Sequence, residues 1–207
     1  MKNTNTHQDL RGLVLAGGRS RRMKQDKAFL QYHDQPQARY CYDLLKQFFA
    51  EVYVSVRPDQ AAHPDLKGLP LIIDKPAYQD KGPLAGILSA INAFPDKGWF
   101  VLAVDLPFVG PKTIRHLIKH RHLENIATCY RSTTDGLPEP LCAILETTAE
   151  VKLKNYYDSR KLCPRKFLIQ EEAAVIQQPV DYALDNINDP DEYAQAQRLI
   201  KTSRHTY

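Results

Sequence analysis

The sequence predicts an α/β fold, a three-layer doubly wound and mostly parallel sheet with helices on both faces. Short apolar runs alternate along the 207 residues with segments of helical periodicity, as repeated strand-helix units require. Most of these runs are continuously apolar, which is typical of strands buried on both faces. Polar side chains follow several runs directly, where ligands bind in open α/β sheets.

Seven apolar runs are predicted strands, and the segments between them carry helical patterns. The strands are expected at residues 12–16, 52–56, 71–73, 100–104, 127–130, 141–145 and 174–176. Apolar residues spaced three or four apart predict three helices, with faces made of Tyr40, Cys41, Leu44, Leu45, Phe48 and Phe49, of Leu84, Ile87, Leu88 and Ile91, and of Ile114, Leu117 and Ile118.

A last helix is expected at residues 190–200. Asp189 can cap it, Pro190 fits its first position, and Glu192 follows three residues after the cap. The length favours one domain over residues 1–207, and we expect residues 1–10 and 201–207 to fray.

Composition excludes several classes of protein. The net charge of +4 is too small to indicate non-specific nucleic-acid binding. No apolar stretch approaches the length of a membrane span, and the polar first nine residues do not resemble a signal peptide. The four cysteines form no Cys-x-x-Cys pair, which favours reduced thiols and a cytoplasmic location.

The first predicted strand leads into a glycine turn and a basic loop. Gly17 and Gly18 let backbone N–H groups approach an anion. The loop adds cationic side chains, namely Arg19, Arg21, Arg22, Lys24 and Lys27. The spacing matches neither a P-loop nor the Gly-x-Gly-x-x-Gly fingerprint. The sequence therefore predicts a polyphosphate site for a nucleotide, with a tight turn beside a solvated loop as the alternative.

Polar residues at the ends of the next strands point to the same site. Asp105 follows an apolar run directly, and near phosphates such a carboxylate needs a cation, for which Mg²⁺ is suited. The alternative is an Asp-x-Pro turn. Asp74 can accept hydrogen bonds from guanine N–H groups, or it can belong to a surface turn. Gly82 opens a helix whose backbone can approach the base or ribose, or simply begins that helix.

Four segments together resemble a known family. Leu15-Ala16-Gly17-Gly18, followed by Arg22-Met23 and Asp26-Lys27, is similar to the nucleotidyltransferase signature. The runs at 82–87, 105–108 and 186–190 follow in the same order, and the set resembles the molybdenum cofactor guanylyltransferases (MobA-type) over about residues 11–200.

The resemblance implies transfer of GMP from GTP to the molybdopterin-bound molybdenum cofactor, with release of pyrophosphate and with Mg²⁺ as cofactor. It implies molybdoenzymes or cofactor-delivery proteins as partners. The catalytic residues it implies are Lys27, Arg22 and Asp105, with Asp105 as the metal ligand. The nucleotide-binding residues would be Leu15, Ala16, Gly17, Gly18, Lys27, Ser55, Asp74, Gly82 and Asp105. Asn186 and Asn188 would bind the pterin.

Alternatives remain at this stage. The chain could use CTP with molybdopterin, transfer a nucleotide to a sugar phosphate, or bind nucleotides without catalysis. Lys24 stands where the family usually has glycine, and Ser55 where it often has asparagine. Asn186 and Asn188 could also simply end a strand and lead into the last helix.

Overall fold

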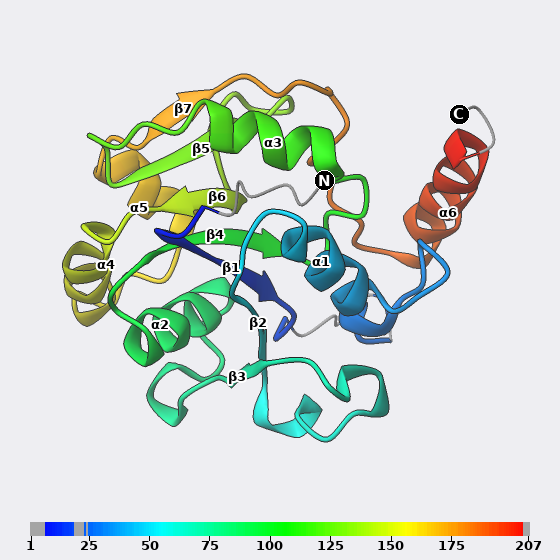
Figure 1. Ribbon diagram of the computed structural model, residues 1–207, viewed down its shortest axis with the longest axis horizontal. Coiled ribbons are helices and arrows are strands. Elements are labelled where there is room, and N and C mark those ends of the chain that lie inside the picture. The colour runs from blue at the N-terminus through cyan, green and yellow to red at the C-terminus, as the bar shows by residue number, and fades with distance from the viewer. Residues whose placement is uncertain (1–6, 19–22, 24, 205–207) are drawn as a thin grey trace.

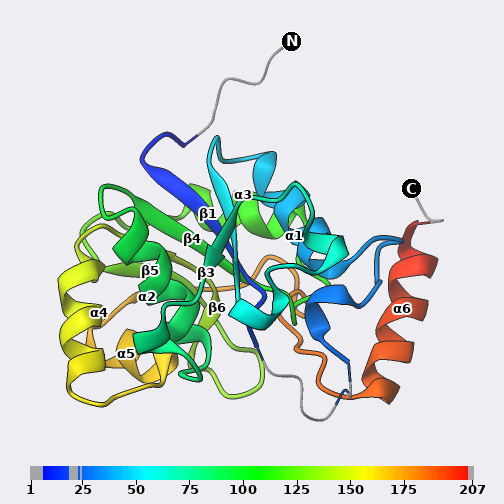
Figure 2. The same cartoon turned by 90° about the horizontal axis from the view of Figure 1, so that it is seen from below.

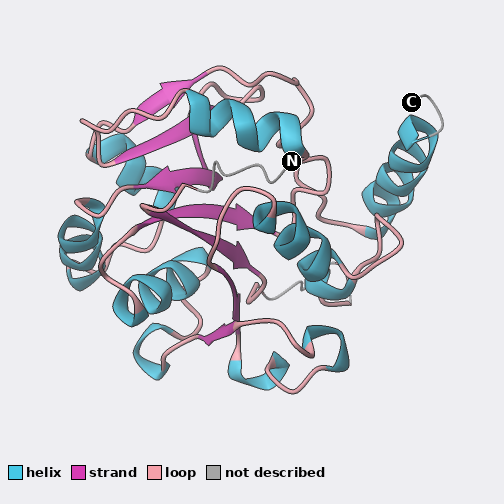
Figure 3. Cartoon of the chain, in the orientation of Figure 1, coloured by secondary structure: helices cyan, strands magenta, loops and turns pink. Residues whose placement is uncertain are grey.

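The computed structural model describes residues 7–18, 23 and 25–204. Within them, seven strands form one sheet in the order β3-β2-β1-β4-β6-β5-β7. Helices cover both faces of this sheet, as Figures 1 and 3 show. The fold class predicted from the sequence is confirmed.

Each predicted apolar run forms a strand. The strands are β1 (Leu10–Leu15), β2 (Val52–Val56), β3 (Leu71–Ile73), β4 (Gly98–Ala103), β5 (Ala127–Arg131), β6 (Pro138–Leu145) and β7 (Ala174–Ile176). The pairs β1–β2, β1–β4, β2–β3 and β5–β7 are parallel. Their carboxyl ends therefore lie at one edge of the sheet.

Strand β6 runs against its two neighbours. It pairs antiparallel with both β4 and β5. A short connection joins β5 to β6, and Gly136 in it adopts a φ of 73°, which side-chain-bearing residues rarely adopt. This reversal brings Glu139, near the start of β6, to the edge at which β4 ends.

Helices predicted from periodicity are present, with two more that the sequence did not reveal. The α-helices are α1 (Gln37–Lys46), α2 (Pro83–Ala93), α3 (Pro111–Lys119), α4 (Ala149–Asp158), α5 (Pro164–Gln170) and α6 (Pro190–Arg204). Short 3-10 turns occupy η1 (Lys27–Phe29), η2 (Pro58–Gln60), η3 (Pro64–Leu66) and η4 (Pro76–Tyr78). No pattern in the sequence predicted α4 or α5.

Two apolar clusters lie on opposite faces of the sheet. In β1, Val14 belongs to the cluster that also contains residues of α1 and α3. Its neighbours Leu13 and Leu15 belong to the other cluster, with residues of α2, α4 and α5. Because successive side chains of a strand point to opposite faces, a strand covered on both sides must be apolar throughout.

Helix α6 lies apart from the sheet. Figures 1 and 2 show it at the side of the molecule, next to the early segment that precedes α1. Ala196 and Ile200 pack there in a small cluster with Met23, Leu30 and Tyr32. The helix therefore closes against the early part of the chain and leaves the carboxyl edge of the sheet accessible.

Regular structure extends toward both ends of the described chain. Leu10 begins β1 and is 1% exposed, and α6 continues to Arg204. The expectation that residues 1–10 and 201–207 fray stays a prediction. None of the described helices combines the length and apolar composition that crossing a membrane requires.

Candidate functional site

A cavity of about 450 Å³ lies at the carboxyl edge of the sheet, and we call it the strand-end cavity. It is formed where β1, β2, β3 and β4 end and α2 begins. Its lining is Leu15, Gly17, Gly18, Lys27, Ser55, Asp74, Gly82, Pro83, Gly86, Ala103, Val104, Asp105, Leu141 and Asn188. Its volume lies in the range of small-molecule sites.

The structure brings together the described residues expected to bind a nucleotide, with one exception. All of them except Ala16 line the strand-end cavity. Ala16 is fully buried, and its carbonyl oxygen accepts a hydrogen bond from Gln60 Nε2 at 3.0 Å. Ala16 therefore contributes to the backbone of the turn but not to the wall of the cavity. Arg22 lies outside the described residues, as do the other basic loop residues Arg19, Arg21 and Lys24.

Asp105 is held in the cavity by the end of β4. Its Oδ1 atom is shielded from solvent and has no hydrogen-bond partner among the described residues. Its Oδ2 atom lies 3.9 Å from Lys27 Nζ. Burial raises the pKa of Asp105, and the lysine charge partly opposes this effect. A shielded carboxylate oxygen without a donor is a suitable ligand for a hard divalent cation.

Lys27 connects Asp105 with the segment that precedes α6. Its Nζ donates a hydrogen bond to Asn188 Oδ1 at 2.9 Å. The backbone N–H of Ile187 donates to the carbonyl oxygen of Asp105 at 3.1 Å. Lys27 follows the basic loop and Asp105 follows β4, so the two residues are far apart in the sequence. The segment 187–188 hydrogen-bonds to both of them.

Asp74 is buried, in contrast to the surface turn considered as an alternative. Asp74 directly follows β3, and its Oδ1 atom accepts a hydrogen bond from Ser55 Oγ at 2.9 Å. Burial raises the pKa of Asp74, against the opposing effects of Ser55 and Arg57. A Cβ on Gly17 would lie 3.0 Å from Asp74 Oδ2. Any larger residue at this position of the turn would crowd the carboxylate.

Gly86 is a further requirement of the site that the sequence analysis did not include among the binding residues. It lies in the first turns of α2, against β1 and β2. A Cβ there would come within 2.8 Å of Leu15 Cδ2 and still closer to Ser55 Oγ. The start of α2 approaches the strands closely only because this side chain is absent. Gly82, which precedes the helix, adopts a φ of 61°.

Arg57 clamps both ends of the basic loop, and sequence reasoning also missed this role. Its Nη1 atom donates to the carbonyl oxygens of Gly17 and Gly18, each at 3.0 Å, and Nη2 donates to Asp26 Oδ2 at 3.0 Å. Gln60 Nε2 donates to the same Asp26 oxygen at 2.6 Å. The only sequence signal was that Arg57 follows the end of β2.

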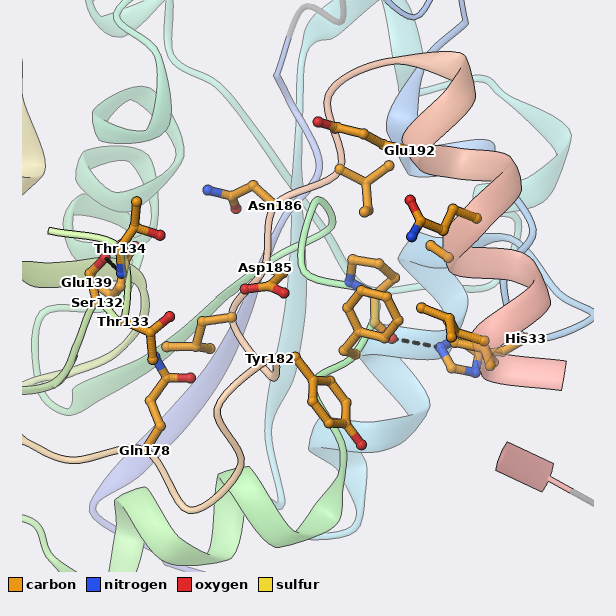
Figure 4. Close-up of a pocket in the computed structure, with 18 of the residues that line it drawn as sticks. His33, Ser132, Thr133, Thr134, Glu139, Gln178, Tyr182, Asp185, Asn186 and Glu192 are labelled. Carbon is orange, nitrogen blue, oxygen red and sulfur yellow. Dashed lines mark hydrogen bonds between the residues drawn. The ribbon is translucent and has the colours of Figure 1, made fainter. Parts of the chain in front are cut away.

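A second, larger cavity of about 1190 Å³ lies beside the first, between α6 and the β5–β6 connection; we call it the α6 cavity (Figure 4). Asn186 lines this cavity, whereas Asn188 lines the strand-end cavity. The two asparagines expected to bind the pterin together are therefore divided between two neighbouring cavities. They lie in the irregular segment between β7 and α6 and do not directly follow a strand.

The cap of α6 fixes this segment. Asp189 Oδ1 accepts from the backbone N–H groups of Asp191 at 3.0 Å and Glu192 at 2.9 Å, which confirms the predicted cap. Glu192 Oε2 in turn accepts from the backbone N–H of Asn188 at 2.6 Å. The reciprocal bonds hold Asn188 at the entrance of the helix.

The fold and the strand-end cavity define an α/β protein of the doubly wound class, with its ligand site beyond the carboxyl ends of parallel strands. Within that class, the chain belongs to the MobA-like NTP transferase domain family, whose model matches residues 12–175. It is a nucleotidyltransferase, of a family that typically depends on a divalent metal.

Individual relatives cover most of the chain. It is 35% identical over 186 residues to the molybdenum cofactor biosynthesis bifunctional protein of Synechocystis, covering 90% of this chain and 53% of that protein. The chain thus spans about half the length of that relative. It is 24% identical over 193 residues to the molybdenum cofactor guanylyltransferase of Campylobacter jejuni, covering 93% of this chain and 98% of the relative.

Solved structures share the fold. The molybdopterin-guanine dinucleotide biosynthesis protein A of Archaeoglobus fulgidus superposes with a TM-score of 0.73 at 20% identity, covering 93% of this chain and 99% of that one. A 2-C-methyl-D-erythritol 4-phosphate cytidylyltransferase from Thermus thermophilus has a TM-score of 0.65 at 16% identity, with 92% and 98% covered. The fold alone therefore does not select the nucleotide.

Proposed function

We propose that this protein transfers GMP from GTP to the molybdopterin-bound molybdenum cofactor, forming the guanine dinucleotide cofactor and pyrophosphate. The observation that carries the proposal is the strand-end cavity, in which Asp105, Lys27 and Asp74 surround the glycine turn. The names of the relatives from Campylobacter and Archaeoglobus agree with this activity.

Asp105 would hold the divalent cation, for which we propose Mg²⁺. The shielded, unpartnered Oδ1 atom fits this role, and Mg²⁺ commonly takes one or two protein carboxylates together with phosphate oxygens. When bound, the ion neutralises part of the negative charge that develops on the phosphates. Lys27, 3.9 Å from Asp105 Oδ2, keeps a second positive charge on the same side of the cavity.

The phosphates would lie against the turn at Gly17 and Gly18. A phosphate oxygen of the second substrate attacks the α-phosphorus, and the bond from that phosphorus to the pyrophosphate oxygen breaks. Lys27 stabilises the charge carried off by pyrophosphate, and we propose Arg22 as a second cation in this role. The protein supplies position and charge but no nucleophile.

Asp74 would read the base. Its carboxylate can accept hydrogen bonds from guanine N1–H and the 2-amino group, and adenine lacks this pair of donors. Ser55 orients the carboxylate through the 2.9 Å hydrogen bond to Oδ1. Leu15, Ala16 and Gly82 contribute to the turn and cavity around the nucleotide.

The second substrate would enter through the α6 cavity and contact Asn186 there. Asn188 lines the strand-end cavity and bonds Lys27, so it would lie where the two substrates meet. The remaining parts of the proposal are a cytoplasmic location, in keeping with the buried free thiols of Cys41, Cys129 and Cys142, and transfer of the product to molybdoenzymes or cofactor-delivery proteins.

Calorimetry with GTP, CTP, ATP and UTP, each with Mg²⁺, tests the nucleotide. We expect binding of GTP that is lost when a chelator removes the metal. Pyrophosphate release from GTP in the presence of molybdopterin then tests the reaction. Metal-dependent binding of CTP without binding of GTP would reject the guanylyl proposal and favour a cytidylyltransferase. Pyrophosphate release with a sugar phosphate in place of molybdopterin would favour the remaining alternative.

A further inference from the structure

The α6 cavity is large and has one aromatic wall. Phe108 and Tyr182 stand edge to face there, with ring centroids 5.8 Å apart and an interplanar angle of 88°. Ser132, Thr133 and Thr134 lie on the opposite wall, as Figure 4 shows. Flat heterocycles are bound by such combinations of rings and hydrogen-bonding groups.

The charges of this cavity do not suit an anion. Among the described residues, no lysine or arginine lines it, whereas Glu139, Asp185 and Glu192 do. Two of these carboxylates already have partners. Glu139 forms an ion pair with Arg165, and Glu192 accepts the backbone N–H of Asn188.

Asp185 is different, because its carboxylate has no hydrogen-bond or ion-pair partner among the described residues. Figure 4 shows it projecting into the cavity beside Asn186. Burial alone raises the pKa of Asp185, since no neighbouring charge or donor opposes the effect. An accessible carboxylate without a partner in the protein is free to accept hydrogen bonds from a ligand that carries N–H donors.

Gln178 lines the cavity on the side of Thr133. Its Nε2 atom donates to the carbonyl oxygen of Arg131 at 3.0 Å, which fixes the orientation of the amide. Its Oε1 atom is shielded and lacks a partner within the described part of the chain. The accessible carboxylate of Asp185 therefore makes its part of the cavity complementary to a donor-rich ring edge.

We propose that Asp185 selects the second substrate by accepting two hydrogen bonds from the adjacent ring N–H and amino group of a 2-amino-4-oxo-pyrimidine edge. The inference rests on the proposed function, in which that substrate carries a pterin. A carboxylate matches two parallel donors in geometry as well as charge. Asp185 would then be the specificity-determining residue of the α6 cavity.

This contact also orients the substrate. The donor-rich ring edge lies against Asp185, and the phosphate end must leave a cavity whose described lining carries no basic side chain except a histidine. Lys27 lies in the neighbouring cavity and bonds Asn188, three residues beyond Asp185. The segment that binds the ring therefore leads directly to the cation that meets the attacking phosphate.

Two stable, commercially available pteridines test the proposal by fluorescence titration. Pterin carries the 2-amino group, and lumazine has an oxygen in its place with otherwise similar size. We expect wild-type protein to bind pterin at least about tenfold more tightly than lumazine. Asp185→Asn replaces one acceptor by a donor and should abolish this preference. The neighbouring exposed Asp181 provides the matched control, and Asp181→Asn should retain the preference.

Guanine has the same donor edge as pterin, so GTP binding is measured on the same variants. Unchanged GTP affinity in Asp185→Asn is expected. A loss of GTP affinity with the pterin preference intact would overturn the proposal, because Asp185 would then read the nucleotide. Equal affinities for pterin and lumazine in the wild type, or no binding of pterin, would also overturn it. Failure of the proposed function is distinct, since it appears as no pyrophosphate release with GTP and molybdopterin while the pterin preference remains.

Discussion

The strand-end cavity and the α6 cavity lie side by side but are built differently. In the first, Ser55, Asp74 and Asp105 stand at the carboxyl ends of the strands β2, β3 and β4 of one sheet. In the second, most of the lining comes from the β5–β6 connection, the segment after β7 and the separate helix α6. The 186–188 segment takes part in both cavities, and so do the segment after β4, through Asp105 and Phe108, and strand β6, through Leu141 and Glu139.

This difference suggests a division of roles. Side chains on buried strands are held more precisely than side chains on loops, and chemistry depends on position. Loops and peripheral helices adapt more easily to the shape of a ligand. We therefore expect changes in the strand-end cavity to lower the rate of transfer, and changes in the α6 cavity to alter the affinity for the second substrate.

The largest effect is expected from Asp105→Ala. Removal of the carboxylate would take away the proposed ligand of the divalent cation, and kcat should then fall at least about 10³-fold. Pyrophosphate release measures the loss, and circular dichroism shows whether the fold persists. Asp43, exposed on α1, gives the control Asp43→Ala. A near-normal rate in folded Asp105→Ala would show that Asp105 does not hold a catalytic metal ion. The expected difference in roles between the two cavities would then lose its main support.

Gly86→Ala tests whether the strand-end cavity is as rigid as its construction implies. The added methyl group meets Leu15 and Ser55, so α2 must move away from the strands. We expect a loss of about 1–3 kcal/mol in the free energy of unfolding and weaker GTP binding. Chemical denaturation and calorimetry measure the two effects. Gly110→Ala is the matched control, because a Cβ there meets nothing within 4 Å. Equal behaviour of the two variants would contradict the expected rigidity.

Asn188→Ala tests the segment that the two cavities share. The change removes the acceptor 2.9 Å from Lys27 Nζ, and the lysine should then be less well positioned. We expect kcat to fall about tenfold with little change in the KM for GTP. Asn186→Ala, in the α6 cavity, should instead raise the KM for the second substrate. If both variants changed only that KM, Asn188 would belong to the pterin site after all.

Much of the strand-end cavity could be predicted from the sequence because each part has a local signal. A continuous apolar run identifies a buried strand, and the next polar residue, as at Asp74 and Asp105, must emerge at its end. Arg57 could not be assigned in this way. Its contacts with Gly17 and Asp26 join residues distant in sequence, and no local pattern encodes them.

The α6 cavity could not be predicted, because nearly all of its contacts, like those of Arg57, join residues that are distant in sequence. Its walls come from segments that are adjacent only after folding, so Asp185 has no local signal that separates it from a surface aspartate. Helix α4 was missed because its apolar face is weak, with Val151 65% exposed. The reversed direction of β6 was also hidden, since a buried strand has the same composition in either direction.

The smallest expected effect compares one carboxylate from each cavity. Burial raises the pKa of both Asp74 and Asp185, so the folded protein binds their protons more tightly than the unfolded chain does. Stability is therefore lost as the pH rises through the folded-state pKa. Replacing either carboxylate by a neutral amide should restore this stability at neutral pH. Asp74 is 5% exposed, and Asp74→Asn should raise both the free energy of unfolding and Tm at neutral pH.

Asp185→Asn should give a smaller gain, because Asp185 is exposed and solvent screens its charge. Thermal unfolding without ligands, at neutral pH and again at about pH 2.5, well below the unfolded aspartate pKa of about 3.9, measures both differences. At the lower pH the carboxylates are protonated in the folded and the unfolded state, so both variants should match the wild type. A gain for Asp185→Asn equal to that for Asp74→Asn would show that the α6 cavity withdraws its carboxylate from water as fully as the strand-end cavity does.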